Sequence, residues 1–273
     1  MRWLRSKRSL LISAFLLGAC AKTPVAEPPH PTLGIPVLRL LSYNVNFGIP
    51  GDRETMAAIR DAHADLALLL ETNAAWEQAL RRDFSTVFPH MLCKRRGGAG
   101  GLCVLSRRPL VEAEFLPPAA EDGWFPAVRV LVESDFGPLQ ILGVHLRPPV
   151  SNGGSYVSGH FVTPGIRFAE IQGFCARLDP KLPTVVAGDF NEDEDGDTAK
   201  FLVGKGFASA LRRYAPGQPT WRWPTMVGEL RKELDHVFYD QRLDVLSAEV
   251  RQAGNSDHLP VIAVIARRGQ GLR

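Results

Sequence analysis

The sequence contains few cysteines, and none of them form a CxxC pair. Only four occur in 273 residues, at Cys20, Cys93, Cys103 and Cys175. Zinc ribbons and thioredoxin-type redox centres need closely spaced pairs, so both kinds of site are disfavoured. The glycine-rich run at residues 97–101 also lacks the Lys-Ser/Thr that completes a phosphate-binding loop. This run therefore indicates a turn.

The first apolar run is too short to span a bilayer. It covers residues 10–17 and follows a basic start that holds four Arg and Lys side chains. This order is typical of a cleaved secretory signal, so residues 1–19 are predicted to be a signal peptide. Residues 17–20 (LGAC) are similar to the processing box of bacterial lipoproteins, which predicts lipidation of Cys20. Ordinary signal cleavage beside an incidental cysteine is the alternative.

Removal of the leader changes the charge of the protein. The mature chain would hold 28 Lys and Arg against 29 Asp and Glu, a net charge near −1 instead of +3. A generally basic surface for nucleic acid is thereby excluded, and only a local basic patch is left open. Residues 20–36 are proline-rich and predict a tether between a lipid anchor and the folded part. The expected location is the bacterial cell envelope.

Cys93 and Cys103 flank the glycine-rich turn of a predicted hairpin. A disulfide across this hairpin and two reduced, buried thiols are both open interpretations. Cys175 falls in a helical pattern, which favours a thiol in the core.

From residue 37 onward, short apolar strands alternate irregularly with helical stretches. Helices are expected at about 52–63, 74–82 and 163–178. Strands are expected at residues 37–43, 66–70, 86–92, 102–106, 127–132, 139–145, 184–187, 234–239, 245–251 and 261–266. No regular strand-helix-strand repetition is present, which argues against a TIM barrel or a Rossmann sheet. Two packed sheets with outer helices, in one domain over residues 37–273, are favoured instead.

Polar blocks stand at the ends of several of these strands. They are Tyr43-Asn44-Val45-Asn46, Glu71-Thr72-Asn73, Val144-His145-Leu146, Gly188-Asp189-Phe190-Asn191, and the late pair Leu234-Asp235-His236 with Ser256-Asp257-His258. A strand end holds a carboxylate, amide or imidazole rigidly at the rim of a core. Each block by itself is weak, because strands often end in a polar residue where the chain returns to solvent.

Taken together and in this order, the blocks resemble the endonuclease/exonuclease/phosphatase superfamily, also called the DNase I-like family. The resemblance covers about residues 37–266, and GDFN at 188–191 and SDHLPV at 256–261 are its most specific parts. The segment at 105–109 (LSRRP) matches a structural stretch of that family. The resemblance implies an α/β (α+β) fold, a four-layer sandwich of two packed mixed β-sheets with helices on the outer faces. It also implies metal-dependent hydrolysis of phosphate esters.

The resemblance further implies a metal site of oxygen ligands. Phosphate ester hydrolysis needs an in-line water, charge compensation on the non-bridging oxygens and help for the leaving oxygen. Asn44 and Glu71 are the expected ligands, with Asp257 beside the metal or one contact removed from it. Mg²⁺ is the expected ion, with Mn²⁺ or Ca²⁺ as alternatives.

The same resemblance implies the catalytic roles. Asp189 would orient or deprotonate the attacking water, and Asn191 would hold a phosphate oxygen. His258 would act as a general base or stabilise charge, with Asp235 bonded to its other ring nitrogen. His145 would assist at the phosphate or the leaving group.

One departure from the family pattern concerns position 46. Abasic-site DNA repair enzymes place an Asp there, and tend to have Tyr at the place of His145, whereas this chain has Asn46. A second metal contact at position 46 and a repair role both lose support.

Three further residues are candidates for substrate contacts. Arg147 and His160 lie in an expected long loop after His145, and Trp221 would stack a base or line a lipid or sugar pocket unless it packs in the core. The acidic stretch at 191–196 resembles the start of an EF-hand, but its first residue is Asn and its twelfth, at position 202, is Leu. It therefore indicates a solvated loop.

The sequence thus predicts an exported, lipid-anchored and monomeric phosphodiesterase, with nucleic acid favoured over phospholipid as substrate. A phospholipid- or inositol-phosphate-type phosphoesterase and a non-catalytic envelope-binding lipoprotein are the alternatives. The surroundings of the site discriminate between the substrates: a basic rim would favour a polyanion, and an apolar rim would favour lipid. The candidate basic residues are Lys94, Arg95, Arg96, Arg107, Arg108 and Arg147.

Overall fold

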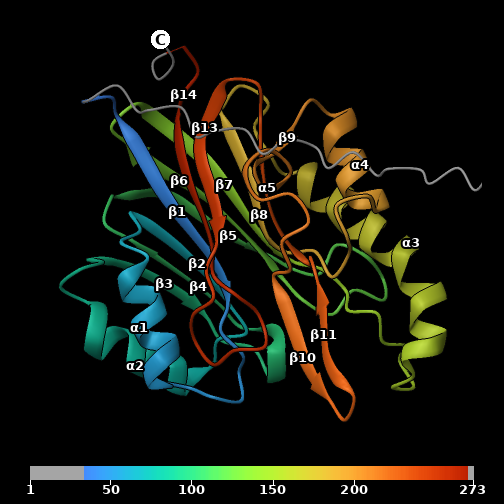
Figure 1. Ribbon diagram of the computed structural model, residues 1–273. Coiled ribbons are helices and arrows are strands. Elements are labelled where there is room, and N and C mark those ends of the chain that lie inside the picture. The colour runs from blue at the N-terminus through green and yellow to red at the C-terminus, as the bar shows by residue number, and fades with distance from the viewer. Residues whose placement is uncertain (1–33, 270–273) are drawn as a thin grey trace, which may run out of the picture.

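The computed structural model describes residues 34–269 of the chain. The predicted signal peptide, Cys20 and nearly all of the tether lie outside the described residues. The described part has four layers (Figure 1): two six-stranded sheets face each other, α1 and α2 cover the first sheet, and α3 and α4 cover the second. The predicted fold class is confirmed.

Both sheets are mixed. The first has the order β13-β14-β1-β2-β4-β3, with β1 (Val37–Asn44), β2 (Leu66–Leu70), β3 (His90–Lys94), β4 (Leu102–Ser106), β13 (Leu243–Val250) and β14 (Val261–Arg267). The second has the order β5-β6-β7-β8-β12-β9, with β5 (Leu110–Leu116), β6 (Ala127–Ser134), β7 (Gly137–His145), β8 (Thr184–Asp189), β9 (Ala208–Ser209) and β12 (Asp235–Tyr239). A separate hairpin is formed by β10 (Trp221–Thr225) and β11 (Gly228–Lys232). The helices are α1 (Arg53–Asp61), α2 (Ala74–Phe84), α3 (Tyr156–Cys175), α4 (Asp197–Gly204), α5 (Ala210–Tyr214) and a short 3₁₀ turn at Gly98–Gly100.

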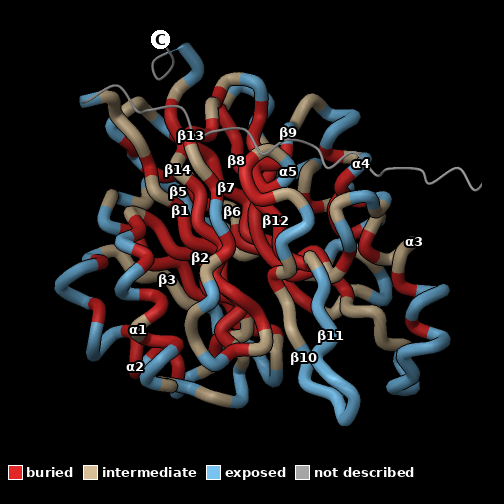
Figure 2. Tube along the Cα trace, in the orientation of Figure 1, coloured by how far each residue is buried: buried red, intermediate tan, exposed pale blue. Residues whose placement is uncertain are grey.

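Alternation of side chains along the strands explains the layers. On β1, Leu38 and Leu40 face the core between the sheets, whereas Leu41 and Tyr43 face α1 and α2. Both faces of the central strands are thus apolar, and Figure 2 shows buried residues along their whole length. Strands buried on both faces read as continuous apolar runs, as residues 66–70 (LALLL) do.

Local capping fixes where the helices start. The side chain of Asp52 accepts the backbone N–H of Thr55 at 2.8 Å, and α1 begins there as expected. α3 begins at Tyr156 and not at Thr163, because Ser155 caps it and Pro164 is tolerated inside the helix. The predicted strand at 86–92 begins only at His90. No helix among residues 34–269 is long and apolar enough to cross a membrane.

Cys93 and Cys103 face each other on β3 and β4 and form a disulfide. Their bond closes a loop with a sequence separation of 10, which restricts the unfolded chain. We expect the double variant Cys93→Ala/Cys103→Ala to lose about 3 kcal/mol of unfolding free energy, or about 6 to 10 °C in Tm. Thermal unfolding followed by circular dichroism measures the shift.

Reductant provides the matched control for this expectation. It should lower the Tm of the unmodified protein toward that of the double variant and leave the variant unchanged. Equal melting temperatures with and without reductant in the unmodified protein would show that the bond does not stabilise the fold.

Candidate active site

Four predicted site residues lie on the strand faces that point into the core between the two sheets. Side chains on a strand point alternately to its two faces. Leu139 and Ile141 of β7 face the inter-sheet core, and counting on by twos brings His145 to the same face. The same count leads from Val185 of β8 to Asp189.

Asn44 and Asp235 obey the same rule on the neighbouring strands. Asn44 follows Leu40 by four residues on β1, and Asp235 precedes Val237 by two on β12. Apolar side chains therefore fill the space between the sheets, and polar ones close it at the end where β1, β2, β7 and β8 stop. The site lies at this end of the sandwich.

Strand register brings three of these side chains into one row. Asp189 pairs with His145 on one side and with Asp235 on the other. Gly188 makes the close approach possible, because a Cβ there would lie 1.9 Å from the carbonyl oxygen of Val144, and its φ is +142°. A glycine is required at this position of GDFN for steric reasons.

The loop after β13 adds His258 to the row. Its Nδ1 lies 2.8 Å from Asp235 Oδ2, which turns Nε2 toward Asp189 Oδ2 at 3.6 Å. Ser256 holds the loop in place, because its hydroxyl donates to the carbonyl oxygen of Asn44 at 2.7 Å and accepts the backbone N–H of His258.

Asp189 Oδ2 is the point where these groups meet. Nε2 of His145 lies 3.5 Å from it, Nε2 of His258 lies 3.6 Å from it, and Nδ2 of Asn44 donates to it at 3.3 Å. All four side chains are buried. The ring of Phe125 stacks on His145 with a centroid distance of 3.9 Å, which fixes the orientation of the imidazole.

Glu71 and Asp257 border this row on the side of the first sheet. Asn44 Nδ2 donates to Glu71 Oε1 at 3.0 Å. Asp257 accepts from Asn46 Nδ2 at 3.0 Å and from Trp221 Nε1 at 3.1 Å. Trp221 thus lies at the site, and its backbone forms a bridge with His258.

The donor set fits a divalent cation. Glu71, Asp189, Asp235 and Asp257 crowd into one region, and buried carboxylates are costly unless a cation compensates them. Ligand atoms of Asp189, Asp235 and His258 lie within 4.8 Å of one another, but the short Asp235–His258 contact there is a hydrogen bond. Asn44, Glu71 and Asp257 offer oxygen atoms alone, the ligands that Mg²⁺ prefers.

Backbone strain is concentrated at the same place. Within residues 34–269, four non-glycine residues have positive φ, and three belong to the site: Asn46 at 59°, Glu71 at 58° and Asn191 at 50°. The left-handed conformation costs roughly 1–2 kcal/mol for such residues and is found preferentially at functional sites. Glu71 in particular has a left-handed backbone, which glutamate rarely adopts.

The two histidines differ in charge. Burial, together with the nearby charge of His258, lowers the pKa of His145 to about 3, so its ring is neutral. Burial also opposes the charge of His258, but the carboxylates of Asp235 and Asp189 outweigh it and raise the pKa of that ring. Burial raises the pKa of Asp189 and of Glu71. One cationic and one neutral imidazole therefore face the same carboxylate.

Two predicted contact residues have other surroundings than the sequence suggested. Arg147 is only 1% exposed; its guanidinium lies 3.3 Å over the Trp124 ring and donates to Asp122 O, Val150 O and Asn152 Oδ1. These partners enclose the guanidinium within the protein, and a role for Arg147 in substrate binding stays a prediction. His160 is exposed on α3 and contacts none of the residues described above.

Asn191 fastens the strand ends of the second sheet. Its backbone N–H donates to Asp189 Oδ1 at 2.8 Å, and its Nδ2 donates to the carbonyl oxygen of Leu146 at 3.1 Å. The hydrogen bonds of Asn191 thus go to Asp189 and the end of β7, and its role at a phosphate stays a prediction.

Sequence reasoning missed Thr220 and Phe125. The Thr220 hydroxyl accepts the N–H groups of Leu234 and Asp235, and its carbonyl accepts the N–H of Leu259. Thr220 thus joins the start of β12 to the His258 loop. Neither residue belongs to a motif, so no pattern along the chain could have identified them.

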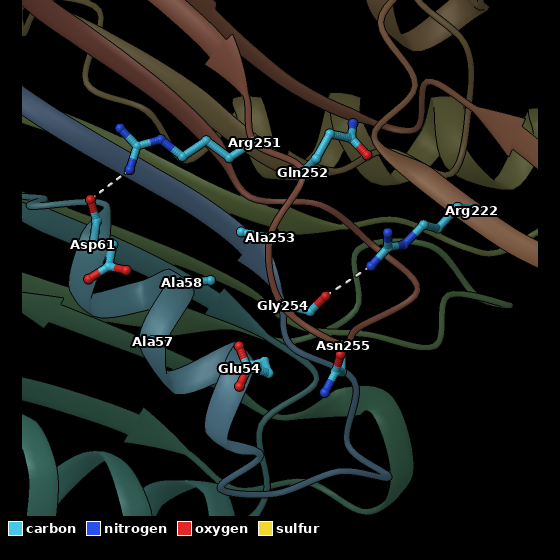
Figure 3. A pocket seen from close by; sticks show the side chains of 10 residues that line it. All are labelled: Glu54, Ala57, Ala58, Asp61, Arg222, Arg251, Gln252, Ala253, Gly254 and Asn255. Carbon is cyan, nitrogen blue, oxygen red and sulfur yellow. Dashed lines mark hydrogen bonds between the residues drawn. The ribbon is translucent and has the colours of Figure 1, made fainter.

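A cavity lies between α1 and the loop at 251–255 (Figure 3). It is lined by side chains of both charges, and Arg222 Nη2 donates there to the carbonyl oxygen of Gly254 at 2.9 Å. Arg251 Nη1 donates to the carbonyl oxygen of Asp61 at 2.6 Å. None of the catalytic candidates line this cavity. Its hydrogen bond from Arg222 to Gly254 holds the loop that leads to His258.

Comparison with solved structures agrees with this geometry. An endonuclease/exonuclease/phosphatase from Beutenbergia cavernae DSM 12333 superposes with a TM-score of 0.66 at 19% identity, over 86% of this chain and 72% of that one. The human Nocturnin catalytic domain with bound sulfate gives 0.63 at 16% identity, over 85% and 95%. D. rerio TDP2 complexed with a single-strand DNA product gives 0.63 at 14% identity, over 84% and 98%. At these identities the likeness concerns the fold.

Sequence comparison identifies the family. No curated protein sequence matches the chain significantly. The model of the endonuclease/exonuclease/phosphatase family, however, matches residues 41–258, which include every polar block described above. The chain belongs to the endonuclease/exonuclease/phosphatase family.

Proposed function

We propose that the protein is an exported, divalent-metal-dependent phosphodiester hydrolase. One observation carries the proposal: Nε2 of His145 and Nε2 of His258 converge on Asp189 Oδ2, at 3.5 and 3.6 Å, beside the oxygen ligands Asn44, Glu71 and Asp257. A water and a phosphate oxygen both find partners in such a cluster. The family comprises hydrolytic phosphoesterases, which agrees with this chemistry.

Each side chain has a task in the proposed reaction. Asp189 orients the attacking water and accepts its proton, since burial raises the basicity of its carboxylate. The cationic ring of His258, held by Asp235, stabilises negative charge on the phosphate oxygens. The neutral ring of His145 would donate a hydrogen bond to the leaving oxygen. A divalent cation at Asn44, Glu71 and Asp257 would compensate the charge of the phosphate group.

The substrate class depends on the surroundings of the site. Nucleic acid would require a local basic rim, but Arg147 is buried, and Arg95 and Arg108 are paired with Glu77 and Asp135. These contacts reduce the positive charge available to a polyanion. We retain nucleic acid and lipid phosphodiesters as the two candidate substrates. We further propose that the protein is a monomer, anchored in the cell envelope through Cys20.

An assay over several substrates tests the function. The purified protein is incubated with plasmid DNA, RNA, phospholipid vesicles, inositol phosphates and bis(p-nitrophenyl) phosphate, with Mg²⁺ or with EDTA. We expect metal-dependent release of product from at least one phosphodiester. Lack of turnover on all of them by a folded protein, with Mg²⁺ or Mn²⁺ present, would contradict the proposal.

A further inference from the structure

Exposed large apolar side chains are unevenly distributed over residues 34–269. Twelve are largely exposed, and eight of these lie on two short segments. They are Tyr156, Val157, Phe161 and Val162 at the start of α3, and Trp223, Met226, Val227 and Leu230 on the hairpin β10–β11. We call residues 156–162 and 223–230 the apolar prongs. Exposed apolar side chains gathered in this way mark an interaction surface.

The hairpin has one apolar face. Trp221 and Trp223 lie on the same face of β10, with their rings stacked at a centroid distance of 6.2 Å, and Trp223 pairs with Leu230 across the hairpin. Arg222 and its cross-strand partner Arg231 occupy the opposite face. Met226 and Val227 form the turn and are 102% and 97% exposed. The apolar face therefore ends in a fully exposed aliphatic tip.

The hairpin is attached directly to the active site, and the other prong starts 11 residues after His145. Trp221, where the apolar face begins, donates to Asp257 and forms a backbone bridge with His258. The other prong follows the chain after His145. Figure 1 shows the hairpin and the start of α3 projecting beyond the same end of the sheets. Whatever binds the prongs is thus brought to the mouth of the site.

The prongs are poor in negative charge. Residues 147–169 contain no Asp or Glu, and residues 220–232 contain three cations, Arg222, Arg231 and Lys232, against Glu229 alone. Arg231 and Lys232 are exposed, and Arg231 Nε lies 2.6 Å from Glu229 Oε1, so Arg222 and Lys232 carry the excess positive charge of the hairpin. In a mature chain of net charge near −1, positive charge is therefore locally enriched beside the apolar side chains. This combination complements the anionic surface of a lipid bilayer.

We propose that the apolar prongs dock the protein on a lipid bilayer and present the active site to the phosphodiesters of lipid headgroups. The catalytic half of this statement rests on the proposed function, whereas the docking half does not. A convex tip of aliphatic side chains next to an indole suits the bilayer interface, which accommodates protruding groups without a preformed cavity.

The predicted anchor is compatible with this orientation. Residues 21–36 lie between Cys20 and β1, and a chain of that length spans at most about 55 Å. β1 begins at the end of the sheets opposite to the site (Figure 1), and the nine residues of β7 indicate that the sheets are about 30 Å long. The hairpin adds about 17 Å. The tether is therefore long enough for the anchor and the prongs to reach the same bilayer.

Vesicle binding tests the docking surface. The leader and the lipid would themselves bind vesicles, so the protein begins at residue 20 with Cys20→Ser and keeps every helix and strand of the described structure. It is sedimented with vesicles of phosphatidylcholine and phosphatidylglycerol (3:1), and with phosphatidylcholine alone. Met226→Glu/Val227→Glu and Phe161→Glu are compared with Val203→Glu, an exposed valine on α4.

We expect the unmodified surface to bind the anionic vesicles more tightly than the neutral ones. The double variant should lower the vesicle partition coefficient at least tenfold and Phe161→Glu at least threefold, whereas Val203→Glu should change it less than twofold. Since the substituted side chains are exposed, equal circular dichroism spectra check the fold. Hydrolysis of vesicle phospholipid should fall in parallel with binding.

Three results would overturn the inference. They are a lack of binding to either kind of vesicle, binding that the three prong substitutions leave unchanged, and a dimer in solution that the double variant dissociates, which would assign the surface to a second copy. A separate measurement of bis(p-nitrophenyl) phosphate turnover distinguishes failure of the docking from failure of the proposed function. Prong-dependent binding without turnover of any phosphodiester refutes the hydrolase alone, and turnover without binding refutes the docking alone.

Discussion

Asp189→Asn is expected to lower kcat for phosphodiester hydrolysis at least about 10²-fold while leaving the protein folded. The amide keeps the size of the side chain and can still accept the N–H of Asn191 at the position of Oδ1. It cannot accept a proton from water, and the loss of a general base costs about 10² to 10⁴ in rate. It also removes a buried carboxylate that has carboxylate neighbours, which lowers the cost of burial.

Steady-state kinetics and thermal unfolding measure the two effects side by side. Asp195→Asn is the matched control, because Asp195 is an exposed acid in the loop that follows Asn191. It should change kcat less than twofold. A loss smaller than tenfold in Asp189→Asn would remove Asp189 from the role of base. A large drop in Tm would instead assign the lost activity to misfolding.

Removal of the metal is expected to have an effect of similar size, and Glu71 should control it. EDTA should lower turnover at least about 10²-fold, because the cation compensates charge at the phosphate. Glu71→Gln should raise the Mg²⁺ concentration for half-maximal activity at least tenfold, since it replaces a charged ligand by a neutral one. The variant keeps the size of the side chain, and its amide oxygen can still accept from Asn44 Nδ2.

Thermal unfolding provides a readout that does not depend on activity. A ligand that binds only the folded state raises stability with its concentration. Mg²⁺ should therefore raise the Tm of the unmodified protein and of Glu54→Gln, an exposed control on α1, but raise that of Glu71→Gln much less. An equal Mg²⁺-induced shift in Glu71→Gln would exclude Glu71 as a ligand.

The fold class and the residues of the row around Asp189 could be predicted from the amino-acid sequence. Short apolar runs predict the strands, and the polar residue that ends each run predicts where the strand reaches the edge of the core. His145 and Asp189 follow from this period of two, because strand geometry is local and repeats along the chain. The capped start of α1 at Asp52 is local in the same sense.

The contacts between the residues of the row could not be predicted from local sequence. That Asp235 bonds His258, and that Asn44 reaches Asp189, depends on strand pairing and loop packing between residues that are 23 and 145 positions apart. The resemblance to the family pointed to these residues as a set. Thr220 and Phe125, which belong to no motif, became visible only through their contacts.

Burial was decided entirely by the tertiary structure. Arg147 reads as a surface cation, yet Trp124 and three oxygen acceptors enclose it. Met226 and Val227 are apolar, yet the hairpin leaves both side chains fully exposed. Apolar composition predicts only the average tendency of a side chain to be buried, whereas the available partners depend on which segments fold over it. The polar residue types at the strand ends can thus be read from the sequence, whereas the exposed apolar side chains beside the site follow from how the chain folds.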